Sequence, residues 1–105
     1  MTLAHLHAGR NMTQRDHSLK WLYNITQEQY DQLLESQNGL CAICYKPPGA
    51  RRLAVDHDHD CCPGKKSCGQ CIRGLLCGRC NIGLGYFQDN IETLIQALMY
   101  LDTGA

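Results

Sequence analysis

The chain has 105 residues, the length of one small domain. Its formal net charge is zero and few phosphates could be neutralised at once, which argues against strong non-specific binding to nucleic acid. No apolar run reaches the length of a membrane span, and the first ten residues lack the apolar core of a signal peptide. The eight cysteines are therefore expected to bind metal in a reducing, intracellular compartment rather than to form the disulfides of a secreted protein.

The N-terminal part contains a tail and the beginning of a domain. Residues 1–14 show no regular pattern and are expected to be a poorly ordered tail, whereas residues 15–105 are expected to form a single domain. A short helix is predicted over residues 15–23. We expect its Trp21 to pack against apolar residues, which is a commoner role for a single aromatic side chain than stacking on a base.

The next helix has clear signals at both ends. Thr26 and Gln29 have the spacing of a capping box, and Ile25 can pack against Tyr30 across the first turn. Gly39 stands where the apolar helical pattern stops. We therefore predict one helix between these signals, leading directly into the first cysteine pair.

The second half of the chain combines short strands and helices. Two strands are predicted over residues 52–57 and 72–77, and the long polar loop between them makes a hairpin. A short helix is expected over residues 81–86. Asp89 resembles the cap of an apolar helix over residues 91–101, which is expected to be part of the core. A homodimer formed through this apolar helix is the alternative.

Two Cys-x-x-Cys pairs stand far apart in the sequence, Cys41 with Cys44 and Cys77 with Cys80. Four thiolates satisfy the tetrahedral preference of Zn²⁺ and leave no open position, so such a site is structural rather than catalytic. We predict that these cysteines bind one zinc ion, which stabilises a chain with a modest apolar core. A pair of disulfides is the alternative.

Four further cysteines lie in the hairpin loop and at its end: Cys61, Cys62, Cys68 and Cys71. The last two form a third Cys-x-x-Cys pair, so we predict a second zinc ion at this group. Adjacent cysteines are awkward as joint ligands, which leaves a free thiol, participation of His59 or a disulfide as alternatives.

Groups suited to metal-assisted hydrolysis lie between the Cys41/Cys44 and Cys77/Cys80 pairs and at Asn81, directly after the second pair. Asp56 offers a carboxylate and Asn81 an amide oxygen, the ligands of a hard ion such as Mg²⁺ or Mn²⁺. Imidazole titrates near neutrality, so His57 can take a proton from water. Because adjacent strand residues point to opposite faces, Asp56 and His57 can act on one phosphate only if the strand ends or bulges there. A polar strand end or a transition-metal site remains the alternative for these residues.

Basic residues are concentrated in the centre of the sequence. Between Cys41 and Asn81 there are seven bases and three acids, whereas the rest of the chain has three bases and seven acids. A locally basic segment suits a polyanion such as nucleic acid. Arg52, Arg73 and Arg79 are the candidate DNA-binding residues of this segment.

The combination of CAIC, LAVDHDHD and IRGLLCGRCNIGLG, followed by an apolar helix, resembles the recombination endonuclease VII family of HNH, or His-Me finger, nucleases. The resemblance covers about residues 23–101. It implies an α+β fold: a small, zinc-stapled ββα-metal hairpin and helix with flanking helices.

The resemblance also implies roles for individual residues. His57 matches the general base, and His59 matches a histidine next to the scissile phosphate. Asp56 and Asn81 match the ligands of the catalytic divalent ion. Arg73 matches an element that contacts the phosphate backbone, and the expected products have 5′-phosphate and 3′-hydroxyl ends.

The sequence therefore predicts a divalent-metal-dependent DNA endonuclease that nicks or cleaves duplex or branched DNA in the cytoplasm of a bacterial cell or phage-infected host. DNA is the expected partner, with no membrane and no small-molecule cofactor. The alternative is a zinc-ribbon module that binds DNA or a protein without cleavage. A redox or metal-storage role for the loop thiols would leave Asp56 and Asn81 unexplained.

Overall fold

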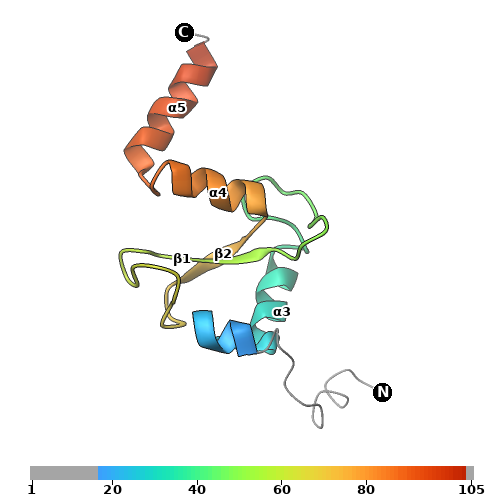
Figure 1. Ribbon diagram of the computed structural model, residues 1–105. Helices are drawn as coiled ribbons and strands as arrows, with labels where there is room; N and C mark the ends of the chain where they lie inside the picture. The colour runs from blue at the N-terminus through green and yellow to red at the C-terminus, as the bar shows by residue number, and fades with distance from the viewer. Residues whose placement is uncertain (1–16, 104–105) are drawn as a thin grey trace.

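The computed structural model describes residues 17–103, so the tail predicted over residues 1–14 lies outside the described part. The elements in chain order are η1 (Leu19–Tyr23), α3 (Gln27–Ser36), β1 (Ala54–His57), β2 (Ile72–Leu76), α4 (Gly78–Tyr86) and α5 (Ile91–Thr103). The strands form an antiparallel hairpin, with α4 on one side and η1 and α3 on the other (Figure 1). This arrangement confirms the predicted α+β class.

Helix α3 has the capping box that the sequence predicts. The Gln29 N–H donates to Thr26 Oγ1 at 3.1 Å, and the Thr26 N–H donates to Gln29 Oε1 at 2.8 Å. Gly39 follows the helix with a φ of +74°, and its N–H donates to the Leu34 carbonyl oxygen at 2.8 Å. A left-handed φ is easiest for glycine, which explains why the chain turns away from the helix there.

The core is small and lies between α3, η1 and the hairpin. Its buried side chains are Leu19, Ile25, Tyr30, Cys41, Leu53, Val55, Leu75 and Leu76. Full burial of one such aliphatic side chain contributes about 1.5–3 kcal/mol. Since Cys41 is among the buried residues, the first cysteine pair begins inside the core rather than on a separate surface loop.

Gln37, just after α3, completes the outer edge of β2. Its Nε2 donates to the carbonyl oxygens of Leu40 and Leu75 at 2.8 and 3.0 Å, and its Oε1 accepts from the Leu75 N–H at 2.9 Å. Gly74 makes room for this amide, because a Cβ at that position would lie 3.1 Å from Gln37 Oε1. One side chain thus joins α3 to the sheet.

Helix α4 begins earlier than predicted. It spans Gly78–Tyr86 rather than residues 81–86, because Cys77 is its N-cap and the Cys77 Sγ accepts from the Cys80 N–H at 3.5 Å. The Asn81 N–H donates to the Cys77 carbonyl oxygen at 2.9 Å, so Asn81 lies in the first turn of the helix. This start places the second cysteine pair at the helix N-terminus.

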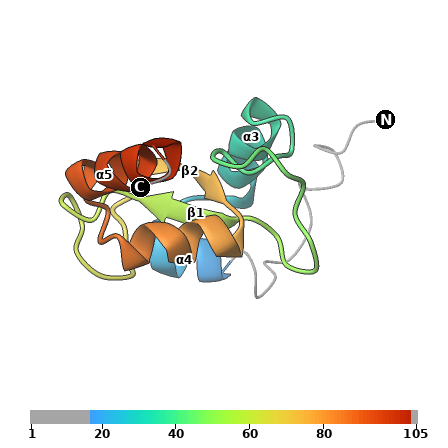
Figure 2. The same ribbon diagram turned by 90° about the horizontal axis from the view of Figure 1, so that it is seen from above.

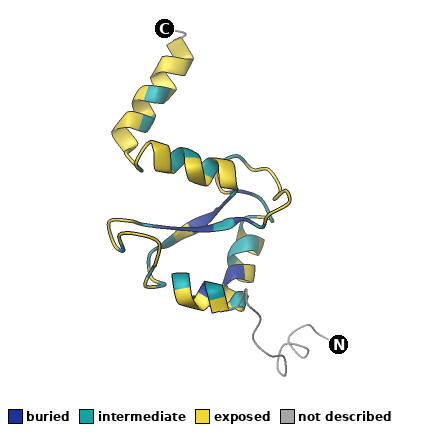
Figure 3. Cartoon of the chain, in the orientation of Figure 1, coloured by how far each residue is buried: buried dark blue, intermediate teal, exposed yellow. Residues whose placement is uncertain are grey.

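Two predictions about α5 are wrong. No residue of α5 is buried (Figure 3). The side chains of Ile91, Leu98 and Leu101 are 73 %, 65 % and 76 % exposed. Figures 1 and 2 show the reason: α5 leaves the hairpin after α4 and lies on the opposite side from α3. The cap is Asn90, whose Oδ1 accepts from the Thr93 N–H at 3.0 Å, rather than Asp89. The homodimer stays a prediction.

Trp21 also departs from its predicted role. Its side chain is 70 % exposed instead of packed in the core, and the Lys66 ammonium lies 3.4 Å from the centroid of its ring. A cation over an indole face is attracted to it, so the exposed ring of η1 contacts the hairpin loop.

Among residues 17–103, no helix combines the length and apolar character that crossing a membrane requires.

Candidate active site and metal centres

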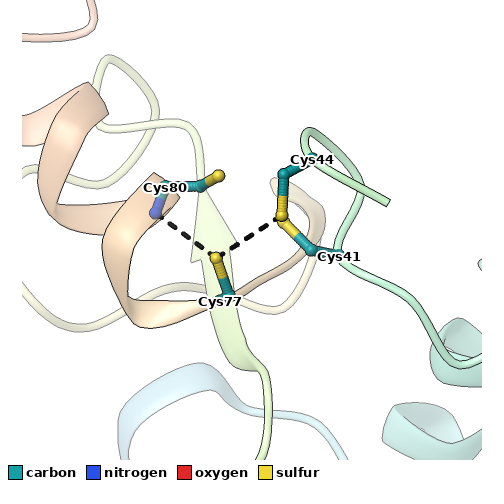
Figure 4. A group of neighbouring side chains, drawn as sticks. All are labelled: Cys41, Cys44, Cys77 and Cys80. Carbon is teal, nitrogen blue, oxygen red and sulfur yellow. Dashed lines mark hydrogen bonds between the residues drawn. The ribbon is translucent and has the colours of Figure 1, made fainter. Parts of the chain in front are cut away.

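The two outer cysteine pairs meet beside the N-terminus of α4 (Figure 4). The sulfur atoms of Cys41, Cys44, Cys77 and Cys80 all lie within 4.8 Å of one another. The Cys44 and Cys77 sulfurs are 3.8 Å apart, which is close to the separation of about 3.8 Å expected for two sulfurs on one tetrahedral zinc ion. The structure thus brings together the four cysteines that the sequence paired, and they could bind zinc.

Two thiols of this group differ strongly in acidity. Burial opposes ionisation of Cys41, but the N–H groups of Cys44, Cys77 and Ile43 outweigh it and lower its pKa to about 6. Burial and the neighbouring thiols raise the pKa of Cys80 to about 12. Additional negative charge is therefore unfavourable here without a cation, and a bound zinc ion would stabilise all four thiolates.

The loop cysteines form a second group. The sulfur atoms of Cys61, Cys62, Cys68 and Cys71 lie within 4.8 Å of one another, and all eight cysteines of the chain are free thiols. The Gln70 N–H lowers the pKa of Cys68 to about 7, whereas the other three thiols raise the pKa of Cys61 to about 12. This group could also bind zinc.

The strand pairing is irregular at the candidate active site. Asp56 pairs with Gly74 and His57 pairs with Ile72, so Arg73 is an extra residue in β2. Such a β-bulge changes the direction of nearby side chains and ends regular pairing. Strand β1 ends at His57, so the irregularity required for adjacent residues to serve one site is confirmed.

The four candidate catalytic residues line one pocket of about 200 Å³. Asp56 and His57 come from the end of β1 and are 7 % and 3 % exposed, whereas His59 comes from the loop and Asn81 from α4. The rings of His57 and His59 are close, with centroids 4.4 Å apart. Residues from three segments therefore face one cavity, as the sequence predicts.

A hydrogen bond determines the tautomer of His57. Its Nε2 lies 3.0 Å from the carbonyl oxygen of Cys62. A carbonyl oxygen only accepts hydrogen bonds, so we assign the proton of the neutral ring to Nε2 and the lone pair to Nδ1. The buried ring is thus oriented by the loop and has one nitrogen available to accept a proton.

Asp56 is joined to His59 through Arg73 and Asp89. Arg73 donates from Nε and Nη2 to the Asp56 carboxylate at 2.7 and 3.1 Å, and from Nη2 to Asp89 Oδ2 at 3.1 Å. The Nδ1 atom of His59 lies 2.8 Å from the same oxygen of Asp89. Burial opposes ionisation of Asp89, but His59 and Arg73 outweigh it and lower its pKa.

Sequence reasoning missed Asp89 as a site residue, because its position before an apolar helix indicated a cap. The only local signal of another role was the following Asn90, which is itself a good N-cap. The backbone of Asp89 has a φ of +54°, which is uncommon outside glycine and turns this residue away from the helix start. Its carboxylate faces the site instead.

The three candidate DNA-binding arginines have different surroundings. Arg73 donates three hydrogen bonds from Nε and Nη2 to Asp56 and Asp89, and its two Nη1 hydrogens take no part in these three bonds. Arg79 is exposed in the first turn of α4. The guanidinium of Arg52 lies 4.9 Å from the centroid of the Tyr30 ring, a packing contact away from the pocket. Their DNA-binding roles stay predictions.

Comparison with known proteins gives consistent matches. The chain is 41 % identical to the Gene 59 protein of Mycobacterium phage D29 over 96 residues, which cover 90 % of this chain and 53 % of that protein. It is 38 % identical to the Gene 59 protein of Mycobacterium phage L5 over 95 residues, covering 89 % and 53 %. The chain therefore spans about half the length of these relatives. No solved structure matches it.

The family comparison covers almost all of the described structure. The sequence profile of the family described as recombination endonuclease VII matches residues 16–103, which include both cysteine groups and the pocket residues. The chain belongs to the recombination endonuclease VII family.

Proposed function

We propose that this chain is a DNA endonuclease that hydrolyses phosphodiester bonds with His57 as general base and one Mg²⁺ or Mn²⁺ ion. The pocket lined jointly by Asp56, His57, His59 and Asn81 is the observation that carries the proposal. Membership of the recombination endonuclease VII family supports it. The hairpin followed by α4 also supports the His-Me finger class that the sequence resemblance implies.

The donor groups suit a hard divalent ion. Asp56 and Asn81 would hold it through a carboxylate and an amide oxygen, the ligand types that Mg²⁺ and Mn²⁺ prefer. Both Asp56 oxygens accept from Arg73, yet each has a second lone pair for a cation. When bound, the ion supplies positive charge that stabilises the pentacovalent phosphate and the departing oxygen.

The residues of the chain supply the proton transfer and the orientation. Nδ1 of His57 accepts a proton from water as the water oxygen forms a bond to phosphorus. The bond from phosphorus to the 3′ oxygen breaks, and this oxygen takes a proton from solvent, which gives 5′-phosphate and 3′-hydroxyl ends. In this proposal, the exposed His59 and the Nη1 hydrogens of Arg73 would contact the phosphate.

The test is nicking of supercoiled plasmid by the purified chain, with Mg²⁺ or Mn²⁺ added or omitted. We expect nicked circles only when the ion is present, and elemental analysis should show that zinc is retained in both conditions. The variant His17→Ala changes an exposed histidine outside the pocket and is expected to behave as wild type. Binding of DNA without any cleavage would favour the non-catalytic zinc module instead.

A further inference from the structure

The loop cysteine group has no part in the hydrolysis proposed above. Cys61 Sγ lies 3.9 Å from the sulfurs of both Cys62 and Cys68. Two sulfurs on one tetrahedral zinc ion are about 3.8 Å apart, because each Zn–S bond is about 2.3 Å long. Disulfide-bonded sulfurs are about 2.05 Å apart. The observed separations therefore fit zinc ligands, and this holds for the adjacent Cys61 and Cys62 as well.

The backbone of this group resembles that of the first group. The Gln70 N–H donates to the Cys68 sulfur at 3.4 Å, as the Ile43 N–H donates to the Cys41 sulfur at 3.4 Å. An N–H group directed at sulfur stabilises the thiolate that metal binding requires. The second group thus has the local structure of a metal knuckle as well as the right number of sulfurs.

A turn at the start of the loop directs the adjacent cysteines to the same side. The N–H groups of Cys61 and Cys62 both donate to the Asp58 carbonyl oxygen, at 3.2 and 3.1 Å. The Asp58 N–H donates to the Cys71 carbonyl oxygen at 2.9 Å. The two halves of the group are therefore joined at the loop end of the hairpin, directly after His57.

The other half of the group is attached to η1 and the residue that follows it. Ser67 Oγ donates to the Tyr23 carbonyl oxygen at 2.9 Å, and Asn24 Nδ2 donates to the Cys68 carbonyl oxygen at 2.9 Å. Gly69 packs closely against this segment, since a Cβ there would lie 2.7 Å from the Asn24 carbonyl oxygen. Cys68 is thus held against an element that contributes to the core.

Cys62 connects the group to the pocket. It supplies a sulfur to the cysteine group and, through its carbonyl oxygen, the acceptor 3.0 Å from His57 Nε2. We propose that Cys61, Cys62, Cys68 and Cys71 bind a zinc ion that holds the Cys62 carbonyl against His57, so that occupancy of this site sets the tautomer and orientation of the ring. The role of the ring as a base rests on the proposed function, whereas the zinc site does not.

Loss of this zinc ion would change the pocket without removing any of its residues. Without the ion, no metal–sulfur bonds join Cys61 and Cys62 to Cys68 and Cys71, so the turn that carries Cys62 would open. His57 Nε2 would lose its acceptor, and both neutral tautomers would then be populated. Fewer rings would offer an Nδ1 lone pair to water. Cys62 is accordingly a positioning residue for hydrolysis and a ligand of the loop zinc.

The experiment compares wild type with the double variant Cys68→Ser/Cys71→Ser. Elemental analysis is expected to give two zinc ions per wild-type chain and one per variant chain. In ¹⁵N NMR at a pH where imidazole is neutral, His57 should be the Nε2-protonated tautomer in wild type and a mixture in the variant. We expect kcat to fall by about 10- to 100-fold, the range found when a metal-ligating histidine loses the group that orients its other ring nitrogen, with DNA affinity unchanged.

Controls separate this proposal from general damage. Asp60→Asn changes an exposed side chain next to Cys61 and should keep two zinc ions, the wild-type tautomer and wild-type kcat. If the double variant does not fold, the single variant Cys68→Ser provides the same three readouts. One zinc ion in wild type, or a variant that loses one zinc ion but keeps the His57 tautomer, would overturn the proposal. A wild type that cuts no DNA would refute the proposed function, while the zinc count and the tautomer would still decide this inference.

Discussion

Asp56 and Arg73 form a two-bond ion pair between the strands of the hairpin, with separations of 2.7 and 3.1 Å. The Asp56 side chain is 8 % exposed and that of Arg73 is 39 % exposed. The pair exists because Arg73 is the extra residue of the bulge in β2. A buried carboxylate is thus neutralised at the point where we propose that it binds a divalent ion.

Replacement of Arg73 should destabilise the fold. Arg73→Ala leaves the buried Asp56 carboxylate without its partner, so we expect the free energy of unfolding to fall by about 1–2 kcal/mol. This is the low end for such a pair, because solvent screens the partly exposed guanidinium. Urea denaturation measures the change. Arg79→Ala, at an exposed position of α4, should change stability by less than about 0.5 kcal/mol. Equal effects of both substitutions would contradict this assignment.

Replacement of His57 should affect chemistry more than folding. His57→Ala removes the general base, and we expect the single-turnover cleavage rate to fall by about 10²–10⁴-fold. Zinc content and circular dichroism should match wild type. A variant that cleaves at the wild-type rate would show that another group activates the water.

Replacement of Cys80 should affect folding more than chemistry. Zinc binding supplies about 10 kcal/mol or more to the folding of small zinc-finger peptides. We therefore expect Cys80→Ser to lose one zinc ion and native helicity together, measured by elemental analysis and circular dichroism. The control is Ile82→Ser, because Ile82 is 58 % exposed in the same helix. A helical, fully active Cys80→Ser protein with one zinc ion fewer would disprove a structural role for this site.

The contribution of Asp89 to the stability of the fold should be lost at acid pH. Because contacts with His59 and Arg73 lower the folded-state pKa of Asp89 below 3.8, they stabilise the fold above that pH and are lost as pH falls through the lowered pKa. At neutral pH we expect Asp89→Asn, which tolerates the left-handed φ of +54° at this position, to cost at most about 1 kcal/mol, since the pair with His59 is partly exposed. The difference from wild type should vanish under strong acid in chemical denaturation. Asp102→Ala, at an exposed position of α5, is the control.

Local signals in the sequence predicted much of the fold. The capping box at Thr26 and the turn at Gly39 depend on residues only a few positions apart, so their geometry follows from short-range hydrogen bonding. The two cysteine groups were also predicted, because ligand types and spacing strongly limit which residues can meet at one ion. The same signals predicted that Asp56, His57, His59 and Asn81 come together, and these four residues line one pocket.

An unusual helix cap and longer-range packing account for what the sequence did not predict. The early start of α4 depends on a thiol acting as cap, and thiols are not among the usual capping groups. Helical periodicity identifies the apolar face of α5 but says nothing of which surface would cover it. The contacts of Asp89 join residues 16 and 30 positions apart, which no local pattern encodes.

The amide of Gln37 also affects how separate molecules can interact. A two-stranded sheet has open edges, and unpaired backbone groups at such an edge can recruit a strand from another chain. Gln37 and the Ala42 N–H together occupy both backbone groups of Leu75, the next-to-last residue of β2. Strand addition from another molecule is therefore blocked at Leu75 without an additional strand.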